Sequence, residues 1–95
     1  MKILWTKAAA EDLDKIEAYI FKDNPGLAVN QILRIINAAE HYLSANPEMG
    51  RWGRLLKTRE YVISITPFVV IYRLKNNILE IIRVLHEAQQ WSEKY

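Results

Sequence analysis

The chain has no cysteine and only two histidines, three glycines and three prolines among its 95 residues. The lack of cysteine excludes disulfide bonds and thiolate metal sites, and two isolated histidines argue against a dedicated zinc site. No window of about 18 residues is free of charged side chains, and the chain does not open with a basic segment followed by an apolar block. We therefore expect a soluble, unexported protein of a bacterial-type cytoplasm, with no cofactor, no metal and no membrane partner.

The length bounds the architecture, because 95 residues suit one domain, 1–95, with a buried core. The net charge of +2 conceals an asymmetry: residues 1–50 carry five Lys and Arg against seven Asp and Glu, whereas residues 51–95 carry eight against four. Such an excess attracts phosphates or an acidic peptide, although a solvated loop that keeps a small protein soluble has the same composition. The densest part holds four cations with no acid among them: Arg51, Arg54, Lys57 and Arg59.

The first part of the chain predicts a short strand, 2–5, followed by an amphipathic helix, 7–22. Thr6 is a suitable N-cap residue for this helix. Apolar side chains recur at helical spacing, and we place the acidic side chains on the opposite, solvated side. The apolar positions are Ala9, Leu13, Ile16 and Ile20, and the acidic positions include Glu11, Asp12 and Asp14.

A second helix is expected after the tripeptide Asn24-Pro25-Gly26. Its asparagine can cap the helix, and its proline can take the first helical position, where the missing N–H costs nothing. The helix should stop near Ser44, because Pro47 biases the preceding residue away from helical geometry. The loop that follows contains two glycines and can hold a short edge strand around 54–57.

Three β-branched runs follow, at 61–65, 69–75 and 78–86, and tight breaks between them predict an antiparallel sheet. Two antiparallel helices would share one apolar face, and only this sheet is large enough to cover it. The predicted fold class is therefore α+β: an N-terminal strand and a two-helix antiparallel hairpin packed on a small antiparallel β-sheet, with a short C-terminal tail.

The register of the last hairpin can be predicted. Asn76-Asn77 should form a two-residue turn, because asparagine tolerates positive φ. Lys75 would then pair with Ile78, and Arg73 would face Glu80 as a cross-strand ion pair. One face of the sheet would pack against the helices. A β-bulge would move the side chains beyond it to the opposite face. The helix-facing set would be Phe68, Val70, Tyr72, Leu74, Leu79, Ile81 and Leu85 with Arg83 at the rim, and the opposite set Val69, Ile71, Ile82 and Val84, bordered by Arg73, Glu80 and His86.

Few residues suggest chemistry. His86, at a strand end, could serve as a general acid or base at neutral pH, although a lone histidine there is more often structural or merely exposed. No serine lies in a nucleophile-elbow context, and no glycine-rich phosphate loop is present. The basic cluster with Trp52 interleaved suits nucleic acid, where cations hold phosphates and an indole stacks on a base. The competing interpretation gives Trp52 a packing role and pairs Arg59 with Glu60.

Several short motifs are spread over almost the whole chain. They are Ala10–Leu13 with Ile16 and Tyr19-Ile20, then 46–51, Thr58-Arg59-Glu60, Pro67-Phe68 with Tyr72-Arg73, and 82–88 with Trp91. No single motif is diagnostic, but the series at these spacings, with this order of elements, is characteristic. The chain resembles the ParE/RelE superfamily of type II toxin–antitoxin toxins, and especially its ParE-like branch.

The resemblance implies a bacterial growth inhibitor encoded beside an antitoxin whose C-terminal segment wraps the toxin. RelE-like members cut messenger RNA in the ribosomal A site, whereas ParE-like members poison DNA gyrase and are not nucleases. Glu60 and Val62 stand where the RelE pattern has lysines, Val69 stands where it has a strand arginine, and the arginine expected after the last strand falls near Glu87. Only His86 matches a position that some ribosome-dependent relatives use for acid–base work. Because cutting RNA needs cations that stabilise the phosphorane, these replacements argue against a nuclease.

We therefore expect a toxin that stabilises plasmids and inhibits growth by binding DNA gyrase, neutralised by a cognate antitoxin in a toxin–antitoxin hetero-oligomer. An acidic, partly disordered antitoxin peptide could fold along the helices and the exposed sheet edge. The alternative is a ribosome-dependent mRNA endonuclease that uses His86 with Arg51, Arg54 and Arg73, and a third possibility is a degenerate toxin kept as an antitoxin partner. The residues expected to contact the target or partner are Arg51, Trp52, Arg54, Lys57, Arg59, Arg83, His86, Gln90 and Trp91.

Overall fold

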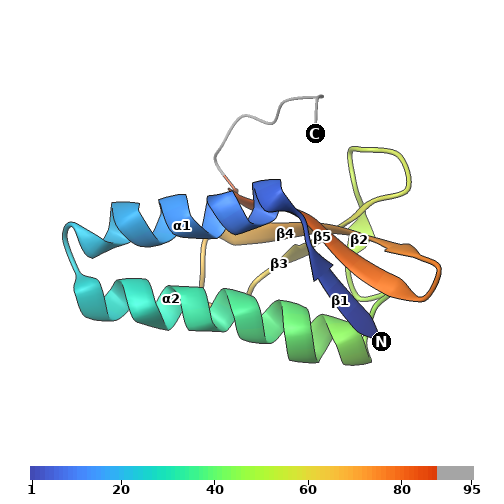
Figure 1. Cartoon of the computed structure of the whole chain (residues 1–95), viewed down its shortest axis with the longest axis horizontal. Coiled ribbons are helices and arrows are strands. Elements are labelled where there is room, and N and C mark those ends of the chain that lie inside the picture. The colour runs from blue at the N-terminus through green and yellow to red at the C-terminus, as the bar shows by residue number, and fades with distance from the viewer. Residues whose placement is uncertain (88–95) are drawn as a thin grey trace.

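Two helices cover one face of a five-stranded sheet in the computed structural model, which describes residues 1–87 (Figure 1). The strand order is β1-β5-β4-β3-β2, so β1 and β2 form the two edges. The α+β prediction is confirmed. The elements are β1 (Lys2–Trp5), α1 (Lys7–Phe21), α2 (Pro25–Asn37), the π-helical η1 (Ala38–Leu43), β2 (Arg51–Trp52), β3 (Arg59–Val62), β4 (Phe68–Lys75) and β5 (Ile78–His86).

The sheet is mixed rather than purely antiparallel, which corrects the expectation from sequence. β1 runs parallel to β5, with Lys2 beside Ile78 and Trp5 beside Ile81. The helical hairpin and three strands separate β1 from β5 along the chain, so no tight turn forces them to run in opposite directions. The first and the last strands of the described chain are therefore neighbours.

Both helices begin where the sequence predicts. The Thr6 hydroxyl oxygen accepts from Ala9 N at 3.1 Å and its O–H donates to Ile82 O at 2.9 Å, so the cap also ties α1 to β5. Asn24 Oδ1 accepts from Leu27 N at 3.0 Å, and Pro25 opens α2. No helix within residues 1–87 is both long and apolar enough to cross a membrane.

The second helical segment continues past Asn37 as the π-helical η1, and helical backbone ends at residue 45, next to the predicted end at Ser44. The wider π turn buries Ala38, Ala39 and Leu43. It also leaves the Tyr42 ring stacked on Tyr61 of β3, with ring centroids 5.4 Å apart. Burial, together with Tyr42, raises the pKa of Tyr61.

Two strand boundaries differ from those predicted. The short edge strand is Arg51–Trp52, and residues 54–57 form a loop instead, because Lys57 has a φ of 63° and Thr58 N donates back to Leu55 O. β3 ends at Val62 because Ile65 has a φ of 62° and Thr66 N donates to Ile63 O, which turns the chain toward β4. After Val62 the local turn therefore overrode the β-branched composition of the segment.

The β4–β5 hairpin follows the predicted register as far as Tyr72 opposite Ile81, with Asn76 and Asn77 both at positive φ. Beyond that pair the register shifts, because β5 carries one extra residue at Ile82. The two faces therefore exchange along the rest of β5, which corrects part of the predicted face assignment: Val84 and His86 join the helix-facing set and Leu85 leaves it.

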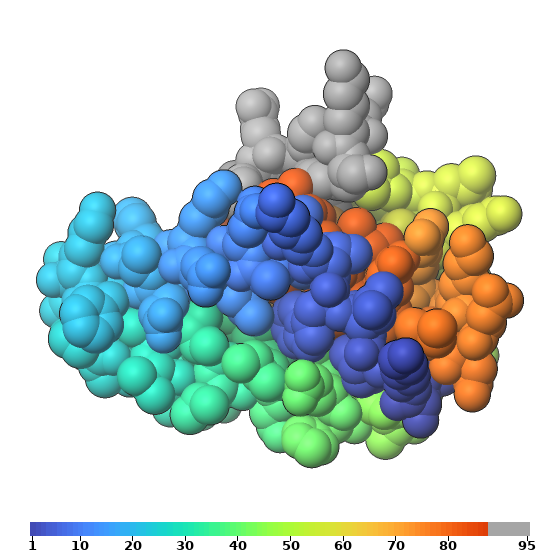
Figure 2. Space-filling model, viewed as in Figure 1, coloured from blue at the N-terminus to red at the C-terminus, as the bar shows by residue number. Residues whose placement is uncertain are grey.

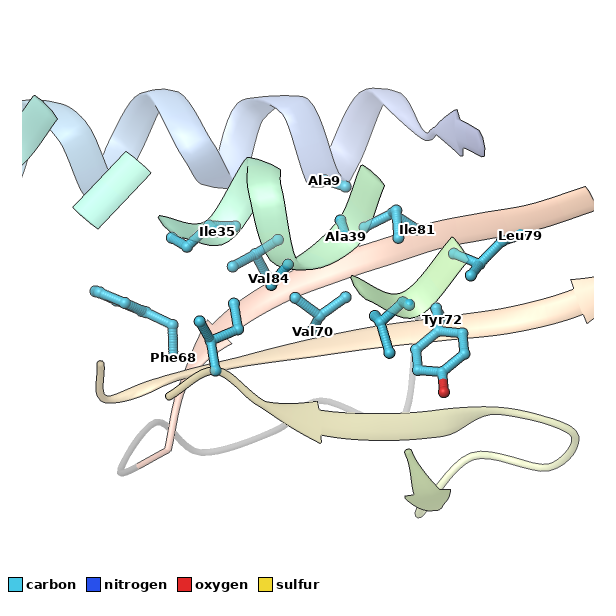
Figure 3. Packing of buried hydrophobic residues seen from close by; sticks show 12 residues of the cluster. Ala9, Ile35, Ala39, Phe68, Val70, Tyr72, Leu79, Ile81 and Val84 are labelled. Atoms are coloured by element: carbon cyan, nitrogen blue, oxygen red, sulfur yellow. The ribbon is translucent and has the colours of Figure 1, made fainter. Parts of the chain in front are cut away.

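The main core lies between the helices and the sheet, as Figure 3 shows. Leu79, Ile81 and Val84 of β5 belong to this cluster together with Ile35 of α2, and all four residues are at most 1% exposed. The opposite face of the sheet also buries side chains: Val69, Ile71 and Leu85 are at most 2% exposed. Burial of both faces explains the continuous apolar runs of β4 and β5.

Asp12 is the main exception to the predicted pattern, because it is buried and not on a solvated face. Its Oδ2 and Oδ1 accept from Arg83 Nε at 2.7 Å and Arg83 Nη2 at 2.9 Å. Asp12 Oδ2 also accepts from Val84 N at 2.9 Å, directly after the bulge. One carboxylate on α1 therefore accepts hydrogen bonds from the Arg83 side chain and from the Val84 backbone N–H, which the bulge diverts from the β4 ladder.

Tyr72 fastens the loop before β2 to the sheet. Its buried O–H donates to Pro47 O at 2.7 Å and its oxygen accepts from Gly50 N at 2.9 Å. A Cβ at residue 50 would lie 2.6 Å from that oxygen, so only glycine permits the approach. Burial raises the pKa of Tyr72, although the Gly50 N–H and the Arg59 cation oppose this shift.

Replacing Tyr72 by phenylalanine should lower the free energy of unfolding by about 1–3 kcal/mol, because the Pro47 carbonyl and the Gly50 N–H lose a buried partner. Urea unfolding of both proteins measures this, with Tyr19→Phe as control, since Tyr19 is 75% exposed. The folded-state pKa of Tyr72 is raised from 10.0, so its contribution to stability is full below that pH and is lost as pH rises through the folded-state pKa. An equal decline of stability at alkaline pH in wild type and Tyr72→Phe would contradict this assignment.

Asp12→Ala should destabilise the fold by about 2–3 kcal/mol, less than the loss of a fully buried pair, because the Arg83 side chain remains 23% exposed. Asp14→Ala removes the same charge from an exposed position of α1 and should change stability by less than about 0.5 kcal/mol. Thermal and urea unfolding give both values. Equal effects of the two substitutions would mean that the Asp12 contacts contribute nothing specific.

Candidate functional site

The basic loop, which we define as residues 51–59, projects from the β2 edge of the sheet. In Figure 2 it is the yellow-green lobe at one end of the molecule, and the connection between α1 and α2 lies at the other end. Backbone bonds close the loop: Gly53 N donates to Thr58 O at 2.8 Å. The Thr58 hydroxyl donates to Leu55 O at 2.6 Å. The loop therefore has a defined shape.

A buried acid lies at the base of this loop. The Glu60 side chain is 2% exposed, and its Oε2 accepts from Arg54 N at 2.8 Å. Its Oε1 accepts from Arg51 Nη2 at 3.4 Å, and Arg54 Nε lies 3.8 Å from Oε2. One carboxylate thus joins two positions of the loop, and the arginine side chains remain 64% and 55% exposed.

Arg59 makes backbone contacts instead of the salt bridge with Glu60 considered above. Its Nη1 donates to Gly50 O at 2.8 Å and to Glu48 O at 3.2 Å. Its guanidinium carbon lies 4.0 Å from the centroid of the Trp52 ring, a cation–π contact. Trp52 is 71% exposed, so this contact holds the indole at the surface and not in the core.

The outer side of the basic loop combines positive charge with exposed apolar groups. Leu56 is 88% exposed and Trp52 is 71% exposed, next to the exposed Lys57. Large exposed apolar side chains on a short loop cost solvation free energy and are typical of binding surfaces. The arrangement suits an anionic partner that also offers an apolar contact.

A groove of about 640 Å³ lies between α1, α2 and the adjoining ends of β4 and β5. Volumes of this size accommodate a small ligand or a few side chains of a bound peptide. Tyr19 and Leu27, 75% and 45% exposed, line it beside more deeply placed side chains. The apolar lining includes Ile16, Ile20, Phe68 and Val84, and the polar lining Lys15, Gln31, Arg83 and His86.

His86 lies in this groove, on the helix side, and not on the opposite face where the sequence placed it. It stands opposite Phe68 in the register, and the two rings meet edge to face with centroids 5.7 Å apart. The β5 bulge is the reason for the change of face. Arg83, predicted at the rim, lines the same groove while it binds Asp12.

The four residues proposed for a nuclease are not brought together. His86 lies in the groove, whereas Arg73 lies near the hairpin turn, where its Nε donates to Glu80 Oε1 as predicted. Arg51 and Arg54 surround Glu60 at the β2 edge. Two other expected contact residues, Gln90 and Trp91, lie outside the described residues. Within residues 1–87 no three His, Asp or Glu side chains are grouped as metal ligands.

Sequence reasoning missed Asp12 and Glu60, the two buried acids that organise these surfaces. A signal existed for Asp12, which lies three residues after Ala9 and four before Ile16, within the apolar stripe of α1. Glu60 is the first acid after four cations, but nothing in its spacing shows that it turns inward. Its role depends on the loop geometry and became visible only in the structure.

Comparison with known proteins gives a consistent family. A family model described as the ParE toxin of type II toxin-antitoxin system, parDE, matches residues 3–91. The chain is 40% identical over 92 residues to the putative toxin Y4kP of Sinorhizobium fredii (97% of this chain, 94% of that protein). It is 33% identical over 88 residues to toxin RelE2 of Caulobacter vibrioides (93% of this chain, 97% of that protein).

A solved structure has the same fold. A chain of the chromosomal ParDE TA system from P. aeruginosa superposes with a TM-score of 0.77 at 25% identity, covering 90% of this chain and 95% of that one. Sequence family, relatives and fold agree with the resemblance inferred from the motifs. The protein therefore belongs to the ParE toxin family, within the ParE/RelE superfamily, and is a toxin of a type II toxin–antitoxin system.

Proposed function

We propose that this toxin inhibits growth by binding DNA gyrase, or its complex with cleaved DNA, through the basic loop. The observation that carries the proposal is the outward display of Arg51, Trp52 and Arg54 around the buried Glu60 carboxylate. Cations of this kind bind phosphates or acidic side chains, and exposed apolar groups add contact area. Lys57 and Arg59 extend the same surface.

The placement of charge favours binding over RNA cleavage. A nuclease needs a general acid or base and phosphate-binding cations around one reacting phosphodiester. Here His86 is separated from Arg73 along the sheet, and Arg73 is paired with Glu80. Arg51 lies on the edge strand β2, and Arg54 lies in the loop that follows it. This placement supports a toxin that acts by adhesion to its target rather than by catalysis.

One observation favours the ribonuclease alternative: Lys15 and Arg83 line the groove together with His86. Asp12 accepts two hydrogen bonds from Arg83, which neutralises much of that cation as a phosphate ligand. The lining is also largely apolar. We accordingly assign the groove to protein binding and keep mRNA cleavage as the outcome that would overturn the gyrase assignment.

The partner that we propose for the groove is a segment of the cognate antitoxin. The structural neighbour described as a ParDE TA system supports such a partner. The groove combines apolar walls with Lys15, His86 and the exposed Tyr19, so an amphipathic, acidic helix complements it. Folding of such a segment on binding would bury the exposed apolar side chains of α1 and α2.

A pair of assays on the purified toxin tests the target. We expect inhibition of gyrase supercoiling with accumulation of cleaved DNA, and no cutting of messenger RNA on programmed ribosomes. Arg54→Gln should weaken gyrase inhibition about ten- to hundredfold, since one charge-assisted contact is worth about 1.5–3 kcal/mol. Ribosome-dependent cutting that disappears in His86→Ala would replace gyrase with mRNA as the target.

The two surfaces should be separable by mutation, because the basic loop and the groove lie on different parts of the fold. Lys15→Glu, in the groove, should leave growth arrest intact while weakening neutralisation by the antitoxin. Arg54→Gln should do the reverse. Co-expression growth assays with and without the antitoxin, supported by calorimetric titration, measure both effects. Loss of both activities in each variant would show that toxin and antitoxin functions share one surface.

A further inference from the structure

Glu60 is unusual because it is a buried acid at the base of a loop whose charged side chains are all cations. Its side chain is 2% exposed, while both arginine side chains that contact it are more than half exposed. Burying a carboxylate is unfavourable unless it is well paired. Within the loop, the hydrogen bond from Arg54 N and the contacts with both guanidinium groups provide that pairing.

We propose that Glu60 is the positioning residue of the target-binding surface: its buried carboxylate fixes Arg51 and Arg54 side by side so that the basic loop binds its target as a preformed unit. The proposal rests on the gyrase-binding function proposed above and names the residue that organises that site. Glu60 itself faces inward and does not touch the target.

The geometry explains why such a residue is needed. Arg51, Arg54, Lys57 and Arg59 repel one another, and a loop that carries them would otherwise spread apart in solution. Glu60 Oε1 and Oε2 lie 3.4 Å and 3.8 Å from the guanidinium nitrogens of Arg51 and Arg54, so one carboxylate brings both cations to the same place. Ordering the side chains before binding reduces the entropy lost on binding.

Gly53 shows how closely the loop is fitted to this carboxylate. A Cβ at residue 53 would lie 3.2 Å from Glu60 Oε2 and 2.5 Å from Thr58 Oγ1. The contact with Thr58 requires a shift of the loop, and the contact with Glu60 is tighter than an ordinary van der Waals contact. Gly53→Ala would therefore disturb the loop around the carboxylate without changing any charge.

Two hypotheses predict opposite changes in the strength of target binding when the Glu60 charge is removed. If the loop acts only through its total charge, Glu60→Gln makes it more basic and should strengthen binding to an anionic target. If Glu60 positions the arginines, the same substitution should weaken binding. The glutamine oxygen still accepts from Arg54 N, but its NH₂ group donates and cannot accept from Arg51.

The experiment compares Glu60→Gln with Glu48→Gln in gyrase supercoiling assays. Both substitutions remove one negative charge, but Glu48 is exposed and contacts the loop only through its backbone carbonyl, which accepts from Arg59. We expect Glu60→Gln to raise the inhibitory concentration about tenfold, as for one lost charge-assisted contact, and Glu48→Gln to leave it unchanged or slightly lower. Unchanged or stronger inhibition by Glu60→Gln would overturn the proposal.

Two glycine variants that leave the charge unchanged test the same proposal even if Glu60→Gln does not fold. Gly53→Ala should also weaken inhibition, whereas Gly26→Ala, whose added Cβ meets its nearest neighbour at 3.7 Å, should not. Antitoxin affinity and the thermal unfolding midpoint serve as readouts of the remaining fold, and we expect both to stay near wild type. Equal inhibition by Gly53→Ala and wild type would contradict the proposal.

The same variants separate failure of this inference from failure of the proposed function. If the wild-type toxin does not inhibit gyrase, the gyrase assignment is wrong, and growth arrest after induced expression becomes the readout for the identical comparison. Growth arrest weakened by Glu60→Gln and Gly53→Ala but not by Glu48→Gln would support positioning toward another target. Growth arrest of equal strength in all variants would refute it.

Discussion

The extra residue in β5 is the constraint on which the functional surfaces depend. It moves Val84 and His86 to the helix side of the sheet, where they line the groove, and leaves Leu85 on the other face. Two side chains fix the bulge: Thr6 donates to Ile82 O and Asp12 accepts from Val84 N. Without this irregularity the histidine would face away from α1, and the groove would lose one wall.

Much of the fold could be predicted from local signals in the sequence, namely helix caps and turn residues. Thr6 and Asn24 mark helix starts because their side chains can accept backbone N–H groups, and Asn76-Asn77 marks a turn because asparagine accepts left-handed backbone. The early register of the hairpin then follows from turn length. The bulge could not be predicted, because it depends on Asp12, a residue far away in the chain that binds the freed backbone group.

The candidate site could likewise be predicted only in part, because some of its contacts are not visible in the local sequence. The basic residues of the loop were recognisable by composition, and exposed Trp52 supports their assignment to a surface. Their organisation was not recognisable, because it depends on the inward Glu60 and on Gly53, whose roles appear only when the loop is closed. Each surface thus contains one buried acid that pairs with arginine: Asp12 with Arg83 in the groove, and Glu60 with Arg51 and Arg54 in the loop.

The parallel pairing of β1 with β5 has a consequence for synthesis of the toxin. Lys2 lies beside Ile78, so β1, which is synthesised before β5, has to wait for β5 before the sheet can close. The hairpin partner of β4 is also β5. A nascent chain that has not yet exposed residues 78–86 cannot complete either sheet contact, and the toxin therefore acquires its folded surfaces only after β5 has left the ribosome.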